Sequence, residues 1–180
     1  MDGGAGAKPG RLASLDEVLA LAGGTHYFIV ELKDDEARYP GLTARVLAAI
    51  RARGLAGRVV LKTFDVGMLA RLAELAPEIP RLYVYVMEFP RLGLTLDHAL
   101  TRGAATARDA RWLQVHRYGL SPAYAERVHR AGYRLVAWDV HEEETMRAAL
   151  AADVDAIETD DPAQLRRLLA EREGCAPVSW

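Results

Sequence analysis

The feature that most constrains this fold is a regular alternation of short apolar runs with amphipathic helical segments. Six such runs follow one another, at Tyr27–Leu32, Arg58–Phe64, Leu82–Met87, Trp112–His116, Leu135–Val140 and Asp155–Thr159. Runs of this length, separated by helical patterns, are typical of buried parallel strands. Sequential strand–helix units with right-handed crossovers form either a closed barrel or an open doubly wound sheet. The alternation therefore predicts an α/β fold of six βα units.

Several helix boundaries can be read from single residues. Ser14 and Glu17 have the spacing of a capping box, and Ser121 and Asp161 each precede a proline suited to the first helical position. Gly54 and Gly132 follow the helical runs 42–53 and 123–131, where a left-handed residue ends a helix.

One domain is expected over residues 1–180, with frayed ends at 1–11 and 173–180. The segment 88–110 interrupts a weak helical pattern with Pro90, Gly93 and Gly103, so we expect a longer loop there. The length and 51% hydrophobic residues suit one globular core.

Composition excludes several classes of function. A net charge of -2 and a pI near 6.2 leave no basic field for nucleic-acid binding. The single Cys175 rules out a disulfide framework within one chain. No apolar run reaches the roughly 20 residues that span a bilayer, and the first residues lack the pattern of a signal peptide. We therefore expect no membrane span and a cytoplasmic protein.

The first strand ends in charged residues. Alternation places Glu31 and Lys33 on one face near the carboxyl ends of the strands, where active sites of parallel α/β folds lie. Glu31 could hold Mg²⁺ or Ca²⁺ while Lys33 neutralises a phosphate oxygen, or the two could form an ion pair that fills the interior. The acidic segment 34–36 that follows disfavours a dinucleotide site.

Other strand ends offer further candidates. Trp138 shares a face with Val136 and Val140 in an alternating strand, so it either floors a pocket or packs in the core. Either Lys62 points inward as a second phosphate contact, or Thr63 does and Lys62 faces solvent.

The histidines and the last acidic residues have simpler interpretations. Gln114 and His116 place two polar groups at the end of the fourth run, and His116 is expected to be a hydrogen-bonded rim residue. His26 should lie at the opposite end of the fold, and Asp161 should cap a helix. His98 and His129 are expected on a loop and a helix surface.

Four segments together resemble the glycerophosphodiester phosphodiesterases, which are metal-dependent TIM barrels. The segments are Leu12–Leu19; the strand Ile-Val-Glu-Leu-Lys at 29–33; Val59–Asp65, with Thr63 where the family has serine; and 132–162, with Val-Ala-Trp-Asp-Val-His and a closing Thr-Asp-Asp-Pro. The resemblance implies strands three to eight of a (β/α)8 barrel, which is the last three quarters of that fold. It implies Glu31 as a ligand of a divalent cation, with Lys33 and Trp138 as substrate contacts.

The chain also departs from the family pattern. The family's two catalytic histidines and two of its three metal carboxylates belong to segments that this sequence lacks, so cation binding is expected to be weakened or absent. Asp139 and His141 stand where the family has threonine and asparagine, and Asp153 replaces a glycine.

Three hypotheses follow. The first is the carboxyl-terminal part of a phosphodiesterase for small phosphodiesters, with little activity alone. The second is a non-catalytic binding or assembly module that associates, for example as a homo-oligomer, through open barrel edges. The third is a different metal enzyme that uses Glu31, His116 and His141.

Overall fold

The computed structural model describes residues 10–21, 26–33, 37–84 and 109–172. In these residues, strands alternate with helices along the chain as the sequence predicts. The strands are β1 (Phe28–Leu32), β2 (Val59–Thr63), β3 (Arg81–Val84), β4 (Trp112–His116), β5 (Arg134–Trp138) and β6 (Ala156–Ile157). The α-helices are α1 (Leu15–Ala20), α2 (Leu42–Ala52), α3 (Val66–Leu75), α5 (Pro122–Arg130), α6 (Glu143–Ala151) and α7 (Pro162–Glu171).

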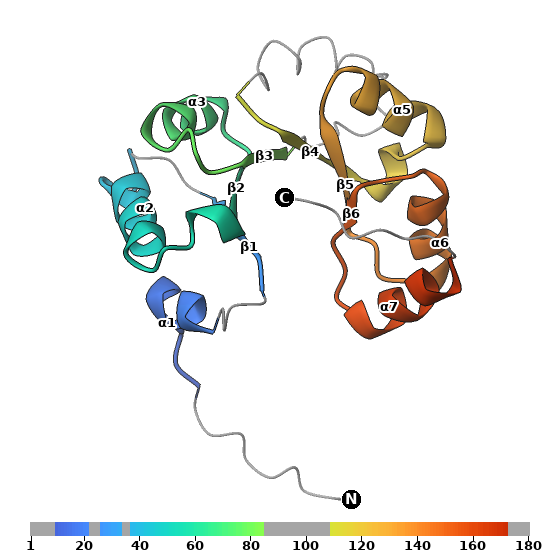
Figure 1. The fold of residues 1–180 in the computed structure, drawn as a ribbon, viewed down its shortest axis with the longest axis horizontal. Helices are drawn as coiled ribbons and strands as arrows, with labels where there is room; N and C mark the ends of the chain where they lie inside the picture. Colours follow the sequence, from blue (N-terminus) through green and yellow to red (C-terminus); the bar gives the residue numbers. More distant parts are fainter. Residues whose placement is uncertain (1–9, 22–25, 34–36, 85–108, 173–180) are drawn as a thin grey trace, which may run out of the picture.

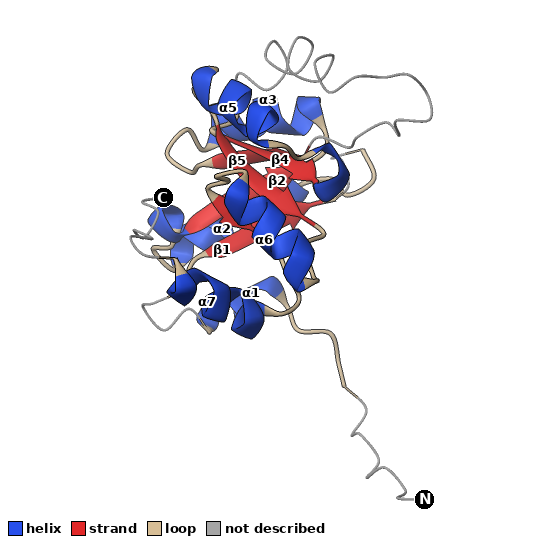
Figure 2. Cartoon of the chain, turned by 90° about the vertical axis from the view of Figure 1, so that its right-hand side faces the viewer, coloured by secondary structure: helices blue, strands red, loops and turns tan. Residues whose placement is uncertain are grey.

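The six strands form one parallel sheet in the order β1-β2-β3-β4-β5-β6. A doubly wound sheet reverses its strand order at a switch point, whereas sequential order is the order of a barrel. The strands follow an arc, and the helices lie outside it (Figures 1 and 2). The predicted incomplete barrel is therefore confirmed.

Apolar side chains fill both faces of this curved sheet. On the outer face, strand residues such as Leu61 and Val115 pack under the helices in three buried clusters. On the inner face, the amino-terminal half of the lumen is filled by Val60, Leu82, Val84, Trp112 and Val136, all of them buried. This apolar layer leaves the carboxyl-terminal half of the lumen for polar groups.

The predicted helix boundaries are confirmed. Ser14 and Glu17 form the capping box of α1. The side chains of Ser121 and Asp161 accept backbone hydrogen bonds at the starts of α5 and α7. Gly132 follows α5 with a φ of 87°, a conformation that glycine adopts without strain.

The fifth strand ends earlier than predicted. β5 stops at Trp138 because Asp139 has a left-handed backbone with a φ of 63°. This turn breaks the alternation, so Val140 packs with Ala137, Met146 and Leu168 on the helical side. The prediction that Val140 shares a face with Trp138 was wrong for this reason. Most of the predicted loop 88–110 lies outside the described residues.

The barrel wall is open beside β1. On the inner face of this strand, Ile29 is 41% exposed, and Tyr27, just before it, is 51% exposed. The outward-facing Leu32 is buried beneath the helices. An inner face that a closed barrel would cover is therefore accessible here. No helix among the described residues is long and apolar enough to cross a membrane.

Candidate functional site

Three strands and the segment just after β6 contribute polar side chains to the upper lumen, the carboxyl-terminal half of the barrel interior. Glu31 on β1 stands beside Lys62 on β2 in the parallel register, and Gln114 projects from β4. Glu158 follows β6, and its backbone N–H donates to the carbonyl of Ala137 on β5. These four residues are named here the lumen cluster.

The ammonium of Lys62 is the centre of the lumen cluster. Lys62 is 6% exposed, and its Nζ lies 3.1 Å from Glu158 Oε2 and 3.4 Å from Glu31 Oε2. Gln114 Nε2 donates to the same Glu158 oxygen at 2.7 Å. Of the two alternatives for this strand, Lys62 therefore faces the lumen, and Thr63 is buried on the other side. A buried ammonium is tolerated because two carboxylates compensate its charge.

Lys33 has a different environment from Lys62. Its Nζ lies 3.6 Å from Glu31 Oε1, and 79% of its side chain is exposed at the rim. The ion pair between Glu31 and Lys33 is therefore present in the structure. Because the lysine side of the pair is exposed, Lys33 can turn toward an anion in solution while Glu31 keeps Lys62 as a partner. Its role as a substrate contact stays a prediction.

Glu158 is the member that sequence reasoning missed. The sequence predicts a strand over Asp155–Thr159, but the acidic residue it singles out there is Asp161, which follows the strand. Alternation along that run places Glu158 on the same face as Ala156, which packs against the inner apolar layer. This pattern was the available signal. The partner across the lumen could not be read from it, because the curvature of the sheet brings β6 opposite β2.

The described residues alone do not fit a divalent cation at Glu31. Hard cations such as Ca²⁺ take six to eight oxygen ligands, whereas Glu31 already has an ammonium beside each oxygen. Like unit charges about 4 Å apart repel by about 4 kcal/mol at an effective dielectric of about 20. Within the described ranges, no three His, Cys, Asp or Glu residues are placed to hold a metal ion.

A second polar group, the rim cluster, surrounds Asp139 at the end of β5. His141 Nε2 lies 2.8 Å from Asp139 Oδ1, and His116 Nε2 lies 3.4 Å from Oδ2. Arg117 Nη1 is 3.2 Å from Oδ2 and also donates to the Asp139 carbonyl. The imidazole of His116 packs edge-on against Trp138, with ring centroids 5.1 Å apart. Three cationic or donor side chains thus converge on one carboxylate.

Backbone donors fix the tautomer of both histidines. The N–H of Tyr118 donates to His116 Nδ1 at 3.3 Å, and the N–H of Asp160 donates to His141 Nδ1 at 3.2 Å. Each neutral ring must then carry its proton on Nε2, which faces Asp139. A metal-binding Nε2 needs the opposite tautomer, in which Nδ1 is the donor.

The third hypothesis loses its support on these contacts. The two histidines turn to Asp139, while Glu31 turns to two lysines. His116 is a hydrogen-bonded rim residue, as predicted.

The rim cluster sets the charge of Asp139. The pKa of its carboxyl lies below the ordinary value, first because His141 donates to it and then because His116 and Arg117 lie beside it, while partial burial opposes this shift. Asp139 therefore stays ionised at neutral pH. The sequence indicated only that this residue departs from the family.

The other histidines lie away from both clusters. His129 on α5 does not simply face solvent, because its Nε2 lies 2.9 Å from Asp155 Oδ2. The same oxygen accepts the backbone N–H of Leu135 at 2.8 Å, which joins α5, β5 and the start of β6. His26 precedes β1 at the opposite end, as expected, and His98 lies outside the described residues.

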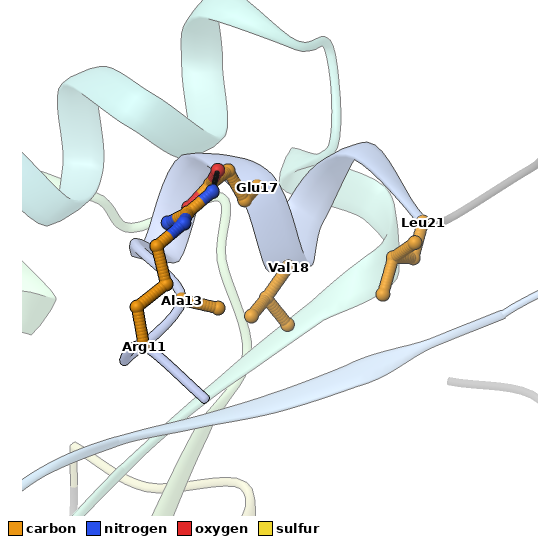
Figure 3. A pocket seen from close by; sticks show the side chains of 5 residues that line it. All are labelled: Arg11, Ala13, Glu17, Val18 and Leu21. Atoms are coloured by element: carbon orange, nitrogen blue, oxygen red, sulfur yellow. Dashed lines mark hydrogen bonds and ion pairs between the residues drawn. The ribbon is translucent and has the colours of Figure 1, made fainter. Parts of the chain in front are cut away.

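A hollow of about 330 Å³ lies beside α1, lined by Arg11, Ala13, Glu17, Val18 and Leu21 (Figure 3). Its two charged residues are bonded to each other, and Glu17 also holds the capping box. The bonds from Arg11 and Ser14 lower the pKa of Glu17 to about 2. The hollow is therefore a feature of the α1 surface and holds none of the predicted site residues.

Comparisons with known proteins agree with this architecture. The model of the glycerophosphoryl diester phosphodiesterase family matches residues 11–164. A glycerophosphodiester phosphodiesterase of Caldanaerobacter subterraneus is 26% identical over 162 residues, which cover 88% of this chain and 62% of that protein.

Solved structures show the same partial match. A protein from Silicibacter pomeroyi, assigned as a glycerophosphoryl diester phosphodiesterase, superposes with a TM-score of 0.73 and 26% identity, covering 87% of this chain and 56% of its own. A phosphodiesterase of Oleispira antarctica, in complex with sn-glycerol-3-phosphate, superposes with a TM-score of 0.72 at 18% identity over 87% and 60%. The chain thus spans less than two thirds of the length of these relatives.

Proposed function

Because this chain belongs to the glycerophosphodiester phosphodiesterase family, we propose that it forms the phosphodiester-binding wall of such an enzyme and has little or no hydrolytic activity by itself. The observation that carries the proposal is the exposed ammonium of Lys33 at the carboxyl-terminal rim of an open barrel. Active sites of TIM barrels lie at this rim. The proposed ligand is a glycerophosphodiester or its product glycerol phosphate, which the Oleispira protein binds.

We assign Lys33 and Trp138 at the rim to different parts of the ligand. Lys33 supplies a positive charge to a phosphate oxygen, and its exposure allows it to move toward the ligand. Trp138 lies at the end of β5 against His116 and offers an apolar surface for the glycerol carbons. Lys62 is held between two carboxylates. A phosphate would have to displace these carboxylates to reach Lys62. We therefore assign Lys62 the role of holding Glu31 in place beside Lys33 and not that of a direct phosphate contact.

The rim cluster supports the expectation of low activity. Acid–base catalysis needs a group that can take and return a proton at the reacting atoms. Both ring nitrogens of His116 and of His141 already have partners, either Asp139 or a backbone N–H. These two histidines therefore do not substitute for the catalytic pair of the family.

Binding and turnover can be measured separately on the purified chain. Titration with sn-glycerol-3-phosphate, followed by NMR, should shift the Trp138 indole N–H signal. Lys33→Ala should weaken binding about ten-fold, the value of one charge-assisted hydrogen bond. Arg130→Ala is the matched control, because Arg130 is an exposed cation on α5. Absence of binding would overturn the proposal, and so would hydrolysis of glycerophosphocholine at the rate of a complete enzyme.

A second candidate function is an assembly module that pairs with strands of another polypeptide. The exposed inner face of Tyr27 and Ile29 favours it, because a closed barrel would cover these side chains. In the described part of the chain, β1 and β6 each pair on one side only. Sedimentation should then show a defined dimer or a complex with a chain that completes the barrel. A stable monomer at all concentrations would argue against this candidate.

A further inference from the structure

The lumen cluster has the geometry of a cation site whose cation is part of the protein. Two carboxylates from strands on opposite sides of the lumen approach one point with their Oε2 atoms, and the ammonium of Lys62 occupies that point. The distances of 3.1 and 3.4 Å are those of direct ion pairs.

The side chains around this point are buried and oriented by a hydrogen bond. Lys62 and Gln114 are both more than nine-tenths buried. Gln114 Nε2 orients Glu158 by donating to the oxygen that also contacts Lys62. Gln114 Oε1 is buried without a hydrogen bond, and so is Glu31 Oε1, which has only the Lys33 ammonium 3.6 Å away. Unpartnered buried oxygens are costly in an apolar interior and are the kind of group that a cation satisfies.

We propose that the Lys62 ammonium is the resident cation of this lumen and holds the position that a divalent ion would need between Glu31 and Glu158. Family enzymes are typically metal-dependent. In this chain the amine neutralises the same carboxylate that the family resemblance predicts as a metal ligand. The inference does not depend on phosphodiester binding, because it concerns only the charges inside the lumen.

The proposal predicts that removal of the amine creates a metal site. In Lys62→Met, a side chain of similar length and no charge removes the ammonium between the two carboxylates and leaves Lys33 as the cation beside Glu31. Loss of the repulsion should tighten Ca²⁺ binding by about ten-fold or more relative to the natural chain. Isothermal titration with CaCl₂ and MgCl₂ measures this change.

Two further variants test whether the position of the removed positive charge matters and whether Glu158 is needed for the new metal site. Lys33→Met removes the same charge from the other side of Glu31, but at an exposed site, and should tighten Ca²⁺ binding far less than Lys62→Met. Lys62→Met with Glu158→Gln should lose the gained affinity. Equal gains in the two single variants would overturn the proposal, as would no gain in Lys62→Met.

The natural chain provides a test that requires no stable variant. The Lys62 ammonium should give protected ¹⁵N signals that stay in place as CaCl₂ or MgCl₂ is added. A saturable shift of these signals, with Glu31→Gln abolishing it, would show that a divalent ion displaces the amine and would overturn the proposal. Unchanged signals, with no saturable binding in the calorimeter, support it.

Discussion

β1 and β4 are both parallel strands with the same alternation, but β4 pairs on both sides and β1 on one side only among the described strands, and their inner faces differ. On β4, Trp112 and Gln114 are fully buried, whereas on β1 Ile29 is 41% exposed. The difference arises from what surrounds each strand. Side chains of β4 meet those of neighbouring and opposite strands, whereas β1 borders the opening in the wall (Figure 1). Burial of an inner-face side chain thus depends on the neighbouring and opposite strands as much as on the strand that carries it.

The sharpest test of this contrast pairs Trp112→Ala with Ile29→Ala. Trp112 fills the inner apolar layer, so its loss should lower the free energy of unfolding by about 3–5 kcal/mol. Ile29→Ala should cost less than about 1 kcal/mol, because much of its side chain is already in water. Urea unfolding of both variants measures this. A cost above about 2 kcal/mol for Ile29→Ala would mean that another chain covers β1 in solution.

The two lysines beside Glu31 provide a second comparison. Lys62→Ala leaves Glu31 and Glu158 without their buried partner and should cost about 2–3 kcal/mol, less than a fully buried pair because Glu158 is partly exposed. Lys33→Ala removes a pair whose lysine is largely in solvent and should stay within about 1 kcal/mol. Chemical denaturation at neutral pH and moderate salt can compare them. Similar costs would contradict the assignment of Lys62 to the interior.

The third prediction concerns Asp155, which lies just before β6 and joins this strand to α5 and β5. Its Oδ2 accepts the backbone N–H of Leu135 and contacts His129 Nε2, so Asp155→Asn should cost about 1–2 kcal/mol. Asp153→Asn provides a control on the neighbouring turn, although this residue is itself left-handed. Thermal unfolding should show a lower midpoint for Asp155→Asn and little change for the control.

The smallest effect on the stability of the fold is expected from Glu17 in α1, which precedes the edge strand β1. The pKa of Glu17 is lowered from 4.5 to about 2 by Arg11 and Ser14. A lowered pKa means that the carboxylate stabilises the folded state fully above pH 4.5, and that this contribution is lost as the pH falls toward 2. A ¹³C NMR titration of the Glu17 carboxyl checks the midpoint. Arg11→Ala should move it back toward its ordinary value.

Much of this fold can be predicted from local patterns. The capping box at Ser14, the prolines after Ser121 and Asp161, and Gly132 each fix a helix end through a short-range interaction, and all are confirmed. Sequential βα units restricted the topology to two choices. The acidic segment after the first strand disfavoured the nucleotide-binding one.

The candidate site was predicted less completely because its contacts cross the barrel. Alternation gave Glu31 and Lys33 a common face but left Lys62 and Thr63 undecided. Glu158 was missed because its partner lies on β2. For Asp139 the sequence indicates only a departure from the family pattern. Its left-handed backbone turns His141 back toward the strand end, which no periodic pattern contains.

The bond between Lys62 and Glu158 joins residues 96 positions apart and links the second strand to the last one. This contact forms only after the strands from β2 to β6 have come together, because its two residues are far apart in the sequence. It therefore stabilises the completed fold and not an early folding step. Unfolding of the segment around Glu158 would leave the buried Lys62 ammonium with Glu31 as its remaining carboxylate. Proteolytic sensitivity of the amino-terminal half should therefore report on the integrity of the carboxyl-terminal half.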